Sequence, residues 1–110
     1  MRVYNKLVRD RIPEIIAKSG DEYRAEILSD DVYKTMLEVK AAEELEEYRQ
    51  ANTRTERIEE LADVLEVIYS LAGANGCSVE KLETVRKKKK EQKGGFSQKI
   101  FLQDVIENKK

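Results

Sequence analysis

The sequence predicts an all-α protein that folds as a four-helix-type bundle, and three observations support this prediction. Helix-forming residues are abundant, and the 110 residues include only one proline and five glycines. Apolar residues recur at helical spacing in two long stretches. Capping residues or glycines stand where the helical stretches begin and end. The length allows a single domain, 1–110, with a modest core.

The N-terminal part of the chain predicts one short helix. Residues 10–18 have helical composition, and Pro13 would occupy an early helical position, where its missing N–H costs nothing. Gly20 follows as a stop signal. We therefore expect a short helix that ends before this glycine.

Two long helices are predicted in the middle of the chain. Ser29 and Asp30 are good N-cap residues for a helix that runs to about Gln50. The polar segment 51–53 interrupts the helical pattern, and a third helix is predicted from about residue 55 to 72. The short connection between them requires the two helices to pack antiparallel.

A fourth helix is predicted between Ser78, a capping residue, and the glycine pair 94–95. Its basic run 86–90 comes late in the helix, where cations complement the helix dipole. Beyond it, residues 99–102 could form a short strand that pairs with residues 25–28. The expected fold therefore includes room for a small two-stranded β element.

In the second predicted helix, a carboxylate falls on the apolar face. With Leu37 at the centre of that face, Glu44 lies only about 20° away at 100° per residue. The other members of the face are Tyr33, Ala41 and Tyr48. An unpaired buried carboxylate is costly, so Glu44 requires a partner. Either Lys40, four residues earlier, forms an ion pair with it, or a metal cation does.

The third predicted helix has a wide apolar face, which we centre on Leu61. The other members of this face are Ile58, Leu65, Ile68 and Ala72. Glu60 lies on its flank with Val67, about 100° from the centre, and Asp63 lies further round. An apolar arc this wide can touch more than one neighbour, which favours a bundle completed by a second subunit.

Acidic residues of these two helices form the predicted metal site, with the ligands Glu44, Glu47, Glu60 and Asp63. Residues three apart on a helix are neighbours, so each helix can offer two carboxylates to one cation. Mg²⁺ prefers oxygen ligands and is commonly shared with substrate phosphates. The chain has no histidine, which disfavours an iron site, so we expect Mg²⁺ with Mn²⁺ as a substitute.

Three segments resemble one known family. The spacing of residues 43–63, E-E-x-x-E followed by E-x-x-D, resembles the signature of the all-α, MazG-like nucleoside triphosphate pyrophosphohydrolases. The opening YNKLVRDRIPEII, residues 4–16, is similar to the start of a small single-domain MazG-like subgroup. The segment KGGF, residues 93–96, is similar to the end of that subgroup. Together the resemblance covers nearly the whole chain.

The resemblance implies Mg²⁺-dependent cleavage of a nucleotide to a monophosphate and pyrophosphate by a homodimer or homotetramer. The family's ligands map onto the four carboxylates named above. Glu60 would be a further ligand or the base that orients the attacking water, and Glu43 is the second catalytic candidate. The expected substrate-binding residues are Lys6, Arg9, Lys40, Lys89 and Lys93.

Composition limits the alternatives. A single cysteine excludes an internal disulfide, and the absence of histidine excludes triads that depend on it. A net charge of −1 makes nucleic-acid binding the weakest reading. The charged N-terminus lacks a signal peptide's apolar core, and no stretch is long enough to cross a bilayer, so we expect a cytoplasmic protein without a membrane partner.

Two alternatives stay open. One is phosphoribosyl-ATP pyrophosphohydrolase, a branch that the opening segment 4–16 does not resemble. The other is a non-catalytic dimeric helical module that binds another protein through its charged faces, which would not need Glu44 on an apolar face.

Overall fold

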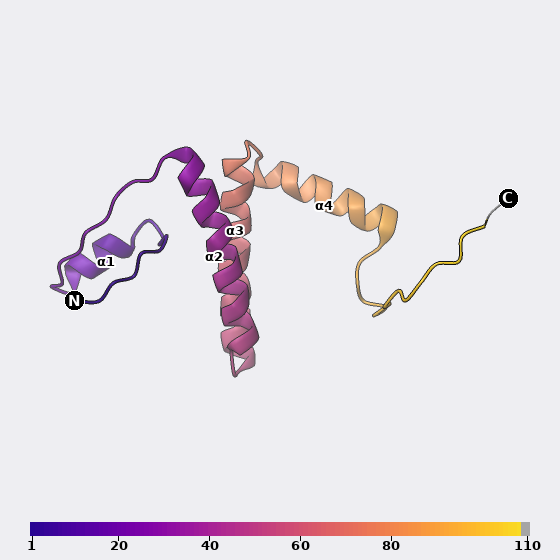
Figure 1. The fold of residues 1–110 in the computed structure, drawn as a ribbon, viewed down its shortest axis with the longest axis horizontal. Helices are drawn as coiled ribbons and strands as arrows, with labels where there is room; N and C mark the ends of the chain where they lie inside the picture. The colour runs from indigo at the N-terminus through magenta and orange to yellow at the C-terminus, as the bar shows by residue number, and fades with distance from the viewer. Residues whose placement is uncertain (109–110) are drawn as a thin grey trace. The chain divides into compact units, whose positions relative to one another are not determined.

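The computed structural model describes residues 1–108, and all regular structure in that range is helical (Figure 1). The helices are α1 Ile12–Lys18, α2 Asp30–Gln50, α3 Arg54–Ala74 and α4 Val79–Lys93. Their bounds lie close to those predicted, so the all-α fold class is confirmed.

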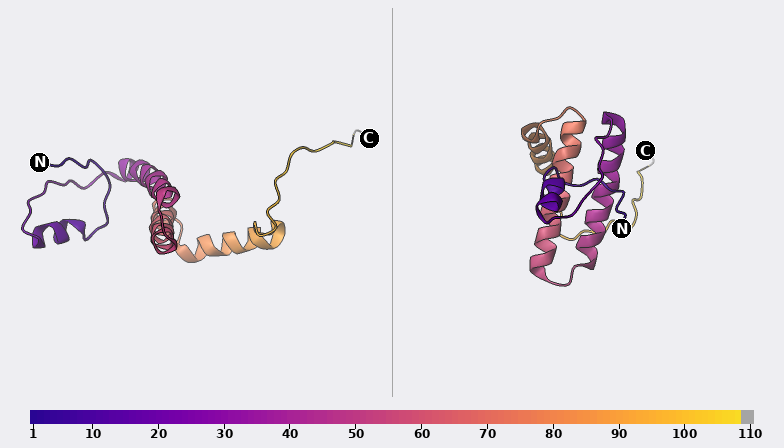
Figure 2. Two further views of the ribbon diagram at one scale, coloured as in Figure 1. Left: turned by 90° about the horizontal axis from the view of Figure 1, so that it is seen from below. Right: turned by 90° about the vertical axis from the view of Figure 1, so that its left-hand side faces the viewer.

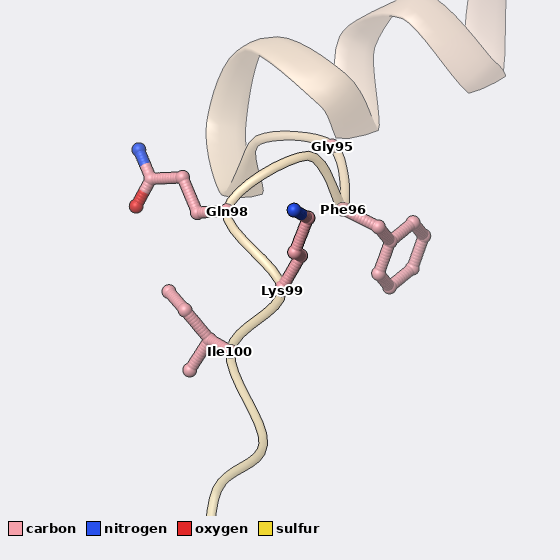
Figure 3. Close-up of a pocket in the computed structure, with 5 residues that line it drawn as sticks. All are labelled: Gly95, Phe96, Gln98, Lys99 and Ile100. Atoms are coloured by element: carbon pink, nitrogen blue, oxygen red, sulfur yellow. The ribbon is translucent and has the colours of Figure 1, made fainter.

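The small β element is not formed, because residues 1–108 contain no strand. In the C-terminal segment, the Lys99 amide donates to the Phe96 carbonyl at 3.1 Å, and the Lys99 φ is 61°. A positive φ takes the backbone out of the extended region that a strand needs. Figure 3 shows this turn, with the side chains of Phe96 and Ile100 pointing away from each other.

The connection between α2 and α3 is set by side-chain capping. The Thr53 hydroxyl accepts the Glu56 amide at 3.1 Å and starts α3. Glu56 in turn accepts the Asn52 amide at 3.0 Å. This reciprocal arrangement resembles a capping box, and the T-x-x-E spacing of these residues is its sequence signature. It reverses the chain within three residues, 51–53, as predicted.

Helices α2 and α3 pack side by side and antiparallel (Figures 1 and 2). Leu37 of α2 is 3% exposed, which confirms the predicted centre of that helix's core face. On α3 the predicted face is buried only in part: Ala72 is buried, whereas Leu61 at its predicted centre is 44% exposed, and Val67 on the flank is buried. The side of α3 that includes Val67 and Glu60, about 100° from Leu61, is the one that turns toward α2.

The chain divides into two compact units, Met1–Val79 and a second that begins at Glu80. The first contains α1 and the packed pair α2 and α3, together with all the predicted metal ligands. Over residues 1–108, no helix combines the length and apolar character needed to cross a bilayer.

Candidate metal centre

The centre begins with a buried glutamate on α2. Glu44 is 6% exposed because it shares the core face of α2 with Leu37, two turns earlier. The expectation of a carboxylate on an apolar face is therefore confirmed. The Oε2 atom of Glu44 is inaccessible to solvent and has no hydrogen-bond partner among the described residues.

Glu47 and Glu60 complete a cluster of three carboxylates. Glu47 lies one turn after Glu44 on α2, and Glu60 comes from the opposing face of α3. One carboxylate oxygen from each of Glu44, Glu47 and Glu60 lies within 4.8 Å of the other two. As at Glu44, the Oε2 atom of Glu60 is buried and has no hydrogen-bond partner within residues 1–108. The antiparallel pair thus brings together three of the four predicted ligands.

The cluster raises the affinity of Glu60 for a proton. Burial, followed by hydrogen bonding with Glu47 and repulsion from its charge, raises the pKa of Glu60 to about 7. Contact with Glu44 and the charge of Asp63 act in the same direction. Removal from water and nearby like charges both disfavour the ionised carboxylate. A bound cation would relieve both effects.

Lys40 compensates part of this charge. Its Nζ atom lies 3.3 Å from Glu44 Oε1 and 3.6 Å from Glu43 Oε2, and its side chain is only 18% exposed. The ion pair considered from the sequence is therefore present. It uses one oxygen of Glu44 and leaves the other unpartnered. Glu43, a predicted catalytic residue, is paired with this lysine and lies outside the cluster of three.

Asp63, the fourth predicted ligand, is paired with Arg9. Arg9 Nη2 lies 2.5 Å from Asp63 Oδ1, and both side chains are partly exposed. Sequence reasoning assigned these residues to different ligands, one to the metal and one to phosphate, and missed their contact. No local pattern connects residues 54 positions apart.

Three further lysines are predicted to bind substrate: Lys6, Lys89 and Lys93. Lys6 Nζ is 5.7 Å from the centre of the Tyr4 ring, in the N-terminal segment. Lys89 and Lys93 are exposed residues of α4, in the C-terminal unit. Their assignment to substrate stays a prediction.

The donor set suits a hard divalent cation. All three clustered groups are carboxylates, two of their oxygens are buried without partners, and no thiol or imidazole is present. Such oxygen-only sites favour Mg²⁺, Mn²⁺ or Ca²⁺ over zinc. The residues therefore fit the metal that the sequence suggests.

Comparisons with known proteins give one similar sequence. The chain is 48% identical over 54 residues to an uncharacterized protein from Mycolicibacterium smegmatis. The match covers 49% of this chain and 55% of that protein, so the chain spans about half the length of the curated relative it matches. No family model and no solved structure matches the sequence.

Proposed function

We propose that the chain is a Mg²⁺-dependent nucleotide pyrophosphohydrolase of the MazG-like type, which cleaves a nucleotide to its monophosphate and pyrophosphate. The observation that carries the proposal is the cluster of Glu44, Glu47 and Glu60, whose oxygens lie within 4.8 Å of one another. Two of its oxygens are buried without a hydrogen-bond partner in residues 1–108, and its carboxylates are of the type that Mg²⁺ shares with phosphates. The sequence motifs supply the reaction class.

In this proposal Glu44 and Glu47 would hold the metal from α2, and Asp63 would hold it from α3. Bound Mg²⁺ would neutralise phosphate charge and acidify water. Glu60 would be a further ligand or the base that orients the attacking water, because its Oε2 atom has no hydrogen-bond partner within residues 1–108. Mn²⁺ should substitute for Mg²⁺.

Lys40 would neutralise Glu43 and Glu44 before the metal binds. Its Nζ atom is within 3.6 Å of both carboxylates, so it limits their repulsion in the metal-free protein. Because Glu43 is held by this lysine, we place it in a supporting position and assign the proton-accepting role to Glu60 first.

A second copy of the chain is the proposed partner. Four large apolar residues on one face of α3 are 40–51% exposed: Ile58, Leu61, Leu65 and Ile68. We call this set the outer stripe of α3. Two copies that join through it would bring their α2–α3 pairs together as a four-helix bundle, which supports a homodimer. A homotetramer would require a further interface.

A non-catalytic dimeric module is the competing function, and the outer stripe supports it equally well. The two functions differ in their need for the buried glutamates. A module that only binds a protein gains nothing from the second oxygen of Glu44, which is buried and which the ion pair with Lys40 leaves without a partner among the described residues.

The deciding experiment measures pyrophosphate release from a panel of canonical and modified nucleotides in the presence of Mg²⁺. We expect turnover by the wild-type protein and a loss of at least about 100-fold in Glu44→Gln and in Asp63→Asn, the scale of losing one major electrostatic group. Glu46→Gln is the matched control, because Glu46 is an exposed residue of the same helix. Retained activity in both site variants would contradict the site, and no turnover on any nucleotide would contradict the function.

A further inference from the structure

The contact between Arg9 and Asp63 connects the N-terminal segment to the carboxylate centre. Arg9 precedes α1, and its carbonyl accepts the Ile12 amide at 3.1 Å, so its backbone is held by the turn that starts the helix. Its guanidinium Nη2 reaches Asp63 Oδ1 on α3 at 2.5 Å. Arg9 thus places a permanent positive charge beside the proposed metal site.

Asp63 belongs to this site by its position on α3. It follows Glu60 by three residues, so the two carboxylates are neighbours on the helix surface. It lies outside the cluster of Glu44, Glu47 and Glu60, and its charge is balanced by Arg9. In the metal-free protein the guanidinium therefore supplies the positive charge that a cation would bring.

The guanidinium of Arg9 and a metal cation would compete for Asp63. Arginine stays protonated at all accessible pH values, so it cannot give way by losing its charge. Arg9 holds the Oδ1 atom of Asp63, so a divalent cation that binds this oxygen must displace the guanidinium from it. The Arg9 side chain is 58% exposed, so it can move through solvent without breaking a packed contact. A released guanidinium has a planar set of N–H donors that suits phosphate oxygens.

We propose that Arg9 is an internal counter-ion of the metal site, which a divalent cation displaces from Asp63 and which then binds the substrate's phosphates. The inference rests on the proposed function and adds a coupling to it: the metal makes the phosphate-binding arginine available. Arg9 would therefore oppose metal binding and favour phosphate binding.

Isothermal titration with Mg²⁺ alone tests the first half. Arg9→Gln should bind Mg²⁺ about threefold more tightly than the wild-type protein, the scale expected for an exposed ion pair. Arg11→Gln is the matched control, because Arg11 pairs with Glu14 at 3.1 Å on α1 and should leave the affinity unchanged. In an Asp63→Asn background, Arg9→Gln should have no effect on Mg²⁺ binding.

Titration with inorganic pyrophosphate at saturating Mg²⁺ tests the second half. Arg9→Gln should bind pyrophosphate at least about tenfold more weakly, because charged hydrogen bonds to phosphate are lost. Arg9→Lys keeps the charge but not the planar set of donors. It should therefore bind Mg²⁺ like the wild-type protein and pyrophosphate more weakly.

Arg9→Gln should therefore raise the affinity for Mg²⁺ and lower the affinity for pyrophosphate. The inference is overturned if Arg9→Gln leaves Mg²⁺ affinity unchanged or weakens it, or if both affinities move in the same direction. If Arg9→Gln folds poorly, Arg9→Lys still tests the phosphate half, and pyrophosphate affinity equal to that of the wild-type protein would overturn the inference. A wild-type protein that binds no Mg²⁺ overturns the proposed function as well. If the wild-type protein binds Mg²⁺ but Arg9→Gln does not change the affinity, only the proposed displacement of Arg9 by the metal is overturned.

Discussion

Glu60 makes the metal-free protein sensitive to pH. Its pKa rises from 4.5 to about 7, chiefly because of burial and then because of Glu47. A carboxyl group with a raised pKa binds its proton more tightly in the folded state than in the unfolded state. The stability it contributes is therefore present below about pH 4.5 and is lost as the pH rises through about 7.

Glu60→Gln should remove this dependence, because glutamine imitates the protonated carboxyl at every pH. In EDTA, the melting temperature of the wild-type protein should fall relative to that of the variant between about pH 4.5 and 7, and the difference should level off above that range. Glu59→Gln, an exposed neighbour on α3, serves as the control and should follow the wild-type curve. Parallel curves for wild type and Glu60→Gln would contradict the assigned environment.

Lys40 is the cation that pairs with the buried carboxylate of Glu44. Its replacement by methionine would leave Glu44 buried without its 3.3 Å partner. We expect Lys40→Met to lower the free energy of unfolding by about 2 kcal/mol, less than for a fully buried pair because 18% of the side chain is exposed.

Arg49→Met is the comparison for Lys40→Met in chemical denaturation. Arg49 pairs with Glu46 at 3.7 Å on the exposed side of α2, so its loss should cost less than about 1 kcal/mol. Equal costs for the two variants would show that the lysine near Glu44 stabilises no more than a surface residue does.

At the scale of the elements, α2 could be predicted from the sequence and α3 only in part. The apolar face of α2 is narrow, so periodicity alone placed Leu37 and Glu44 in the core, where they are 3% and 6% exposed. The apolar arc of α3 is wide enough for two faces, and periodicity cannot choose which of them turns toward α2. The side with Glu60 does so, which also brings Glu60 to the α2 carboxylates.

The contact between Arg9 and Asp63 marks a second limit of sequence reasoning. The two residues lie 54 positions apart, and their pairing depends on the path of the chain between them. In contrast, the capping arrangement of Thr53 and Glu56 is local, and its T-x-x-E spacing would have placed the start of α3 at Arg54.

The outer stripe of α3 leads to a prediction about assembly. Leu61→Lys with Leu65→Lys should reduce the molar mass in solution from about twice 12.7 kDa to about 12.7 kDa, since lysine opposes burial of the stripe. Light scattering would measure the mass, and circular dichroism would verify that the helices remain. Val39→Lys is the control, because Val39 is 45% exposed on α2, outside the stripe. A wild-type monomer, or a double variant that stays dimeric, would contradict the interface.

At the scale of the whole molecule, the effect of Mg²⁺ on thermal stability distinguishes an enzyme from a protein-binding module. The proposed ligands all belong to the unit Met1–Val79, and three of them crowd their oxygens within 4.8 Å, so a bound cation should stabilise the folded chain specifically. At a free concentration 100 times the dissociation constant, the gain is about 2.7 kcal/mol. For a chain of this size that gain corresponds to a rise in melting temperature on the order of 10 °C.

Thermal unfolding in millimolar Mg²⁺ and in EDTA would measure this rise. Glu44→Gln should lose most of it, and Glu46→Gln, on the exposed side of the same helix, should keep it. Screening by salt acts on both variants alike, so potassium chloride of the same ionic strength separates it from binding. A module that uses only its outer stripe has no reason to respond to Mg²⁺, and equal melting temperatures in Mg²⁺ and EDTA would therefore favour the module over the enzyme.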